Sequence, residues 1–229
     1  FTHPFGSVTN HFMNWIKPLY YRVILLSIFF VLQSVDTKAR IARTLTLTKQ
    51  DIVDLLRIEK HLNTNKTIRS RFLQVSSDGS YAEGILHVQR PGKMRIEYDA
   101  PNPTMIIADG INLLYIDKKL EQVTPMLLIF TPADFILRNK ITFSSEDVLV
   151  TGFSRTPGVI RVSVVKAKNP LEGQIMLVFS DSPLELRKWI VTDGQGIKTT
   201  VSLLGAEFGV QVSSDLFEYE IPDTYSDNN

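Results

Sequence analysis

The chain has 229 residues, which is enough for one domain of ordinary size with a short appendage. It carries 25 basic and 24 acidic side chains, a formal net charge of +1, and its basic residues are dispersed along the chain. That balance gives no reason to expect binding to nucleic acid. Cysteine is absent, which excludes disulfides, a thiolate nucleophile and a lipid-modified cysteine within this sequence.

The first 39 residues have the pattern of an export signal preceded by a short leader. From Met13 a basic segment is followed by an apolar stretch at residues 23–32 and by a polar end that closes on Ala39. An apolar stretch of about ten residues is too short for a bilayer, which takes roughly twenty. We therefore expect a start at Met13 and a secretory signal peptide that is removed, which leaves a single domain at residues 40–229. A retained membrane anchor and a buried helix are the alternatives.

Residues 48–62 predict an amphipathic helix. Thr48 can cap it, and Asp51 stands three residues later, as in a variant of the capping box. The apolar stripe is expected to hold Ile52, Leu55, Leu56 and Leu62, and the wet face Lys49, Asp54, Arg57 and Lys60. An isolated helix of this length is marginal in water, so its stripe must pack on another element.

From residue 67 onward, apolar residues alternate with period two, and short clusters of turn residues separate the runs. We expect strands at residues 68–75, 81–90, 94–98, 104–108, 112–117, 121–124, 148–153, 159–166, 174–179, 184–192, 198–204 and 217–220. Connections this short allow only antiparallel neighbours. The sequence thus predicts a mainly β protein with one antiparallel sheet of about eleven strands, which must curl into an incomplete barrel.

An apolar segment at residues 126–140 interrupts the strands, and its second half predicts a short helix that starts after Thr131-Pro132. Two helical segments are therefore available to cover one face of the sheet. The side chains expected to form this lid are Leu55, Leu56, Phe135, Ile136 and Leu137.

The face that the lid covers is expected to include one side of a hairpin that turns at Pro91-Gly92. Its apolar side chains are Leu86, Val88, Met94, Ile96 and Tyr98. These residues alone leave two readings open, a permanently packed core and a cavity that opens to a guest. Arg90 lies at the rim of the same face, where it either reaches water along its stem or donates hydrogen bonds to backbone carbonyls of the lid.

Residues 40–229 contain only two histidines, His61 and His87, and both fall outside any cluster of nucleophiles or metal ligands. No glycine-rich phosphate loop is present either, since Gly194 and Gly196 have neither a helix nor a lysine at the required spacing. We expect a protein that is not an enzyme and has no cofactor or metal.

The hairpin also carries a resemblance to a known family. The pattern Gly84-x-Leu86-x-Val88-x-Arg90-Pro91, followed by Tyr98-x-x-Pro101 and then Asp109-Gly110, resembles the LolA family of periplasmic lipoprotein carriers. The similarity is dense from about residue 72 to 139 and looser from there to residue 222.

This resemblance implies a half β-barrel whose concave face, at Leu86, Val88, Met94, Ile96 and Tyr98, opens to hold acyl chains. It places the lid-closing arginine of the family at Arg90. It also implies a monomer in the periplasm that takes lipoproteins from an ATP-driven inner-membrane exporter and delivers them to an outer-membrane receptor. The receptor itself is excluded, because it is a lipoprotein and needs a cysteine. The alternative is a half-barrel sensor or binding module that recognises lipoproteins or an envelope partner without carrying them.

Overall fold

The computed structural model describes residues 45–219. The predicted signal segment lies outside the described residues, as does the last residue of the predicted strand at 217–220. Within residues 45–219, no helix is both long and apolar enough to cross a bilayer.

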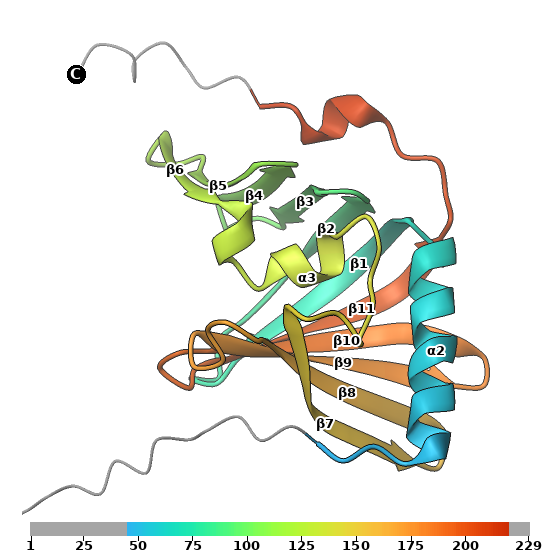
Figure 1. Ribbon diagram of the computed structural model, residues 1–229. Helices are drawn as coiled ribbons and strands as arrows, with labels where there is room; N and C mark the ends of the chain where they lie inside the picture. Colours follow the sequence, from blue (N-terminus) through green and yellow to red (C-terminus); the bar gives the residue numbers. More distant parts are fainter. Residues whose placement is uncertain (1–44, 220–229) are drawn as a thin grey trace, which may run out of the picture. The chain divides into compact units, whose positions relative to one another are not determined.

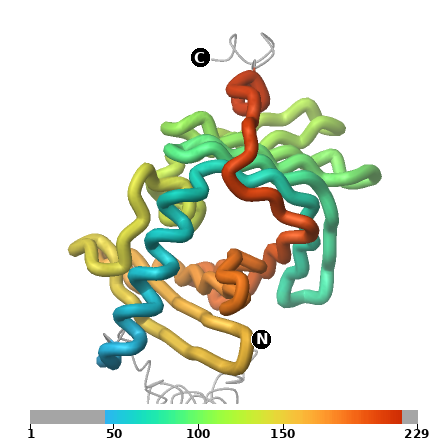
Figure 2. The backbone as a smooth tube through the Cα atoms, turned by 90° about the vertical axis from the view of Figure 1, so that its right-hand side faces the viewer, coloured from blue at the N-terminus to red at the C-terminus, as the bar shows by residue number. Residues whose placement is uncertain are grey.

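The described residues form one antiparallel sheet of eleven strands (Figure 1), as the sequence predicts. The strands are β1 (Thr67–Ser76), β2 (Tyr81–Gln89), β3 (Lys93–Tyr98), β4 (Thr104–Asp109), β5 (Asn112–Asp117), β6 (Gln122–Leu127), β7 (Val148–Thr156), β8 (Val159–Lys166), β9 (Gly173–Asp181), β10 (Leu184–Asp193) and β11 (Lys198–Phe208). Their spatial order is β6-β5-β4-β3-β2-β1-β11-β10-β9-β8-β7, so β6 and β7 are the two edges and the sheet does not close into a barrel. Figure 2 shows the sheet curving round, with a helix (cyan) crossing its concave side.

The β2–β3 hairpin has the register that its alternation predicts. Leu86 pairs with Ile96 and Val88 pairs with Met94, so all four side chains point to the concave face. Gly92 turns the chain with a φ of 75°, and a Cβ there would lie 2.6 Å from the Cα of Gly110. The turns after β2 and after β4 therefore pack directly against each other.

Helix α2 (Lys49–Thr64) begins with the predicted capping box. The backbone N–H of Asp51 donates to Thr48 Oγ1 over 3.2 Å, and the N–H of Thr48 donates to Asp51 Oδ2 over 2.9 Å. These bonds satisfy donors that the first turn of a helix leaves free.

The face that α2 buries differs from the predicted one. Its buried residues are Asp54, Leu55, Ile58 and Leu62. Leu56 is 58% exposed, so its expected packing in the lid is wrong, and Ile52 is exposed as well. Leu55, Ile58 and Leu62 form a stripe at spacings of three and four, and Leu56 lies about 100° around the helix from Leu55. The expected solvation of Asp54 is also wrong, because this side chain is fully buried.

The segment between the two sheet edges forms the second part of the cover. It contains the short helices η1 (Leu128–Phe130) and α3 (Ala133–Leu137), and α3 ends earlier than the predicted residue 140. Phe135 and Leu137 are buried in the main core, and Ile136 packs against it from a half-buried position. The predicted cover of the concave face is thus present in both its parts.

The expected strand at residues 217–220 is wrong over its described part, because a short helix, η2 (Ser214–Phe217), stands at its start. Phe217 is buried to 2% exposure, and Arg95 Nη1 donates to Leu216 O over 3.2 Å. Tyr219 packs against a second apolar cluster of β4 and β5 that contains Met105 and Ile116. The segment therefore covers the far side of the sheet instead of extending its edge.

Candidate functional site

The concave face of the sheet is a continuous apolar layer. Of the predicted lining, Leu86, Val88, Met94 and Ile96 are buried, and Tyr98 packs at the margin with its hydroxyl donating to Gln74 Oε1 over 2.7 Å. The same cluster takes in residues of all the strands from β7 to β11, and its largest member there is Trp189, beside the fully buried Phe179, Leu177, Ile160 and Leu186. Leu55, Phe135 and Leu137 of the cover pack onto it. In this structure the face is closed by its cover.

A cleft opens beside this core, between the second part of the cover and strands β7, β8 and β9. Its empty volume is about 490 Å³, including its open mouth. Phe130, Pro132 and Phe135 form one wall, and Val164 and Ile175 form the other. None of the five predicted hairpin side chains lines this cleft.

Arg90 sits where the cover meets the hairpin and is only 7% exposed. Its Nη1 donates to the backbone oxygen of Arg138 over 3.2 Å, and its Nη2 donates to the backbone oxygen of Asn65 over 3.3 Å. Asn65 and Arg138 are the C-cap residues of α2 and α3. The contact with lid carbonyls that one reading of the sequence predicts is therefore present, and it reaches both covering helices.

The electrostatics of this contact follow from its surroundings. Burial lowers the pKa of Arg90, and no carboxylate pairs with it within residues 45–219. A guanidinium keeps its charge in such a site, and carbonyls at the ends of helices carry partial negative charge. The carbonyl oxygens at the two helix ends are thus the counterpart of this cation. The neighbouring turn adds a third link, because the Gly92 N–H donates to Leu137 O over 2.7 Å.

The two parts of the cover are also bound to each other. The Asn63 side chain exchanges two hydrogen bonds with the backbone of Ile141, at 2.8 and 2.9 Å. Glu59 accepts from the backbone N–H of Phe143 over 2.6 Å. These bonds join α2 to the segment after α3, so the two parts are expected to move together.

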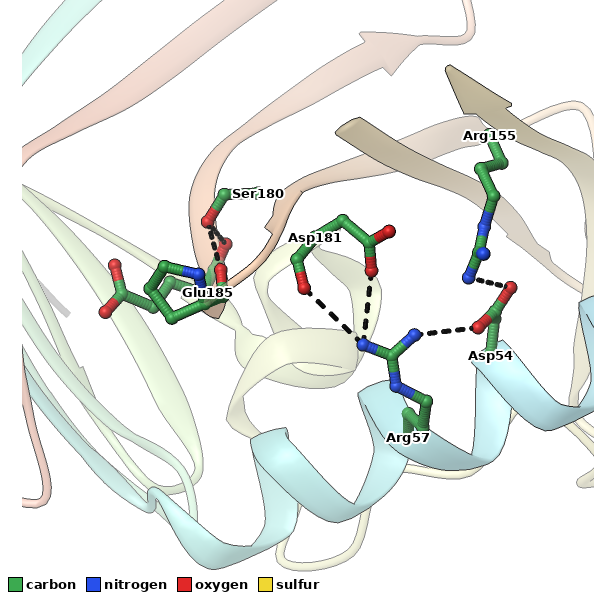
Figure 3. Close-up of polar contacts among 7 residues, drawn as sticks. Asp54, Arg57, Arg155, Ser180, Asp181 and Glu185 are labelled. Atoms are coloured by element: carbon green, nitrogen blue, oxygen red, sulfur yellow. Dashed lines mark hydrogen bonds and ion pairs between the residues drawn. The ribbon is translucent and has the colours of Figure 1, made fainter. Parts of the chain in front are cut away.

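The N-terminal half of α2 has its own polar attachment (Figure 3). Arg57 Nη1 donates to Asp54 Oδ1 over 2.9 Å, and Arg57 Nη2 donates to Asp181 Oδ1, at the end of β9, over 3.1 Å. Arg155 of β7 forms an ion pair with Asp54 Oδ2, but that contact lacks the geometry of a hydrogen bond. Because Asp54 is fully buried, these contacts compensate a charge that would otherwise be costly.

The two histidines of the described residues occupy structural positions. His61 lies edge-on to Phe179 and Phe208, and burial lowers its pKa while Glu185 opposes the shift. Burial also lowers the pKa of His87, and Arg69 and Arg95 add to this. Within residues 45–219, no group of three or more histidine, aspartate or glutamate side chains is placed to hold a metal ion. The geometry described here is that of a covered apolar face.

Comparison with known proteins adds a family to this geometry. Residues 63–220 match the family model described as outer membrane lipoprotein carrier protein LolA. An outer-membrane lipoprotein carrier protein of Azotobacter vinelandii is 26% identical over 192 residues, which cover 80% of this chain and 91% of the relative. Proteins of the same name from Pseudomonas syringae pv. syringae and Pseudomonas aeruginosa are 28% and 29% identical, each covering 75% of this chain and 86% of the relative.

The polar attachment of α2 leads to a prediction about stability. Asp54→Asn removes the buried charge and leaves two arginines without it. We expect a loss of about 1–3 kcal/mol in the free energy of unfolding, measured by denaturant titration. The lower part of the range reflects the partial exposure of Arg57 and Arg155, at 42% and 38%.

The matched control is a solvent-exposed ion pair of the same sheet. Arg69 and Glu207 lie 2.5 Å apart with side chains about half exposed. Glu207→Gln should change the free energy of unfolding by less than about 1 kcal/mol. Equal effects of Asp54→Asn and Glu207→Gln would show that the buried carboxylate does not hold α2.

Proposed function

Since the chain belongs to the family of the outer membrane lipoprotein carrier protein LolA, we propose that it shields the acyl chains of lipoproteins in the periplasm and delivers them to an outer-membrane receptor. The observation that carries this proposal is the closed concave face together with its cover. A large apolar face is covered by helices whose ends are tied to the sheet through one buried cation, Arg90. An ATP-driven inner-membrane exporter is the proposed donor of the cargo. The protein acts as a monomer, without a cofactor.

The energetics favour a carrier that binds and releases without covalent chemistry. Each methylene removed from water is worth about 0.8 kcal/mol, so acyl chains gain strongly from any apolar shelter. Room for them on the concave face requires the cover to move, because Leu55, Phe135 and Leu137 occupy that space in the closed structure. When the cargo is released, the empty protein recovers the packing of its own core. This packing offsets part of the free energy that is lost when the acyl chains leave.

The proposed lining of the opened cavity is Leu86, Val88, Met94, Ile96 and Tyr98, with Leu55, Phe135, Ile136 and Leu137 on the moving side. Leu56 is left out of this set because it faces outward. The closed face is also compatible with a module that recognises lipoproteins without carrying them. Cargo distinguishes the two, since a carrier must hold acylated protein inside the fold and a recognition module holds none there.

The test of the carrier is the mass of what co-purifies from cells in which transfer to the outer membrane is blocked. We expect acylated protein with the parent chain and a loss of most of it with Met94→Glu, because a buried unpaired carboxylate costs several kcal/mol. Met94 is 4% exposed and pairs with Val88 on the concave face.

The control for this test is Ile85→Glu, on the opposite face of β2, where the side chain is 41% exposed. It should retain cargo. Circular dichroism establishes that both variants are folded. Parent protein that purifies without any acylated protein would contradict the carrier function.

The role of Arg90 is tested by the loaded fraction and the rate of transfer in Arg90→Leu. Charge-assisted hydrogen bonds are worth roughly 1.5–3 kcal/mol each, so losing two should shift the balance from closed to open at least about tenfold. We expect loaded protein to accumulate and transfer to slow, because the empty closed state that favours release is weakened. Arg90→Lys should restore only part of the parent rate, since an ammonium lacks the planar fork.

Arg69→Leu, which removes an exposed arginine of the same sheet, is the control and should transfer like the parent. If Arg90→Leu unloads as fast as the parent, Arg90 is a rim residue and not a lid latch.

A further inference from the structure

Apolar side chains are exposed together at one edge of the sheet. Along β6 and η1, and in the turn before β5, the exposed large apolar residues are Ile111 at 71%, Met126 at 42%, Leu127 at 47%, Ile129 at 61% and Phe130 at 73%. The turn and η1 are adjacent, because Leu128 N–H donates to Ile111 O over 2.9 Å and Asn112 pairs with Leu127. We call these five residues the β6–η1 patch. Large apolar groups gathered on a surface in this way indicate an interaction site.

Basic side chains lie directly beside the patch. A cleft that Ile129 and Phe130 help to line also contains Arg138, Lys140, Lys166 and Lys168. Lys166 Nζ donates to the backbone oxygen of Ile129, which fixes one of these cations against the patch.

The same cleft contains three acidic residues against its four cations, so it keeps a net charge of +1. Asp134 and Asp147 both pair with Arg138, at 2.9 and 2.7 Å, and Glu172 accepts a hydrogen bond from Asn169 over 2.7 Å. No ion pair joins Lys140, Lys166 or Lys168 to a carboxylate in the part of the chain that the structure describes. The patch therefore borders three lysines without an acidic partner.

We propose that the β6–η1 patch is a membrane-contact surface that docks on an anionic phospholipid bilayer. Aliphatic and aromatic side chains enter the boundary between head groups and acyl chains, and neighbouring lysines reach the lipid phosphates along their apolar stems. The patch offers both kinds of group at one edge of the sheet. This inference goes beyond the proposed function, because it assigns a lipid surface as a partner and requires no cargo.

The edge strand itself argues against a strand from another protein as the occupant. β6 lacks a backbone donor at Pro125, near its middle, so a row of hydrogen bonds to an added strand would be interrupted. Five of its six residues are exposed. A fluid bilayer needs no such row of bonds.

The place of the patch suits a carrier that exchanges lipid-modified cargo. η1 leads directly into α3, and the backbone oxygen of Arg138, which ends α3, accepts a hydrogen bond from Arg90. Docking through the patch would bring the bilayer next to the part of the cover that Arg90 holds.

The proposal is tested by flotation with protein-free vesicles. We expect the parent protein to float with phosphatidylethanolamine vesicles that contain phosphatidylglycerol, and to float much less with phosphatidylcholine vesicles or in high salt. The double variant Ile129→Ser/Phe130→Ser should bind about tenfold more weakly. Lys166→Gln/Lys168→Gln should lose about fivefold per lysine and most of the dependence on salt.

Tyr81→Ser is the matched control, because Tyr81 is 75% exposed and lies on β2, with β3, β4 and β5 between it and β6. It should float like the parent. All variants share the same N-terminal segment. This segment therefore cannot account for differences in flotation among them. Thermal unfolding establishes that each variant is folded.

Any of four results would overturn the proposal. The first is that the parent protein does not float, and the second is that the Ile129→Ser/Phe130→Ser variant floats as well as the parent. The third is that the same variant abolishes a dimer seen by light scattering, which would assign the surface to a second copy. Binding only to vesicles that contain reconstituted membrane protein would assign it to a protein partner and overturn the proposal as well. Co-purified acylated protein alongside failed flotation would leave the carrier function standing without the membrane contact.

Discussion

The concave face of the sheet has to be covered, because an antiparallel sheet that curls without closing leaves one apolar layer with no second sheet against it. Eleven strands contribute to a sheet whose edges, β6 and β7, stay apart. Helix α2 and the segment between those edges supply the missing layer. The same requirement underlies the proposed function as a carrier. In that proposal, acyl chains of the cargo replace the helical cover on the apolar face.

The cover packs on the sheet through apolar side chains of both its parts, and a small number of polar contacts fix its position. Arg90 binds the carbonyl ends of α2 and α3, and Asp54 attaches the other half of α2 through Arg57 and Arg155. The bonds from Asn63 and Glu59 join the two parts of the cover. Because these bonds join its two parts, we expect the cover to move as one unit in the proposed carrier.

Much of this architecture could be predicted from local pattern. The alternation around Pro91-Gly92 fixed the faces of β2 and β3, and Thr48 with Asp51 marked the start of α2. The apolar stripe of α2 at Leu55, Ile58 and Leu62 follows helical spacing and is readable from the sequence. The burial of Asp54 could not be predicted, because its pairing depends on Arg155, which is distant in sequence. The short helix at Phe217 could not be predicted for the same reason. Phe217 is buried on the far side of the sheet, and the local sequence does not indicate which strands it meets there. The contact of Arg90 with the lid was one of two readings, and only the folded arrangement decides between them.

In the proposed carrier, the cover moves away from the sheet when acyl chains enter. The chain has no cysteine, so spin labels can be placed at will on Leu56→Cys and Ile85→Cys, which are both exposed, on α2 and β2. The distance between the two labels should be measured in empty protein and in protein whose load of acylated cargo has been verified by mass. We expect a longer and broader distribution of distances in the loaded form. An identical distribution in the two forms would contradict the proposed movement of the cover.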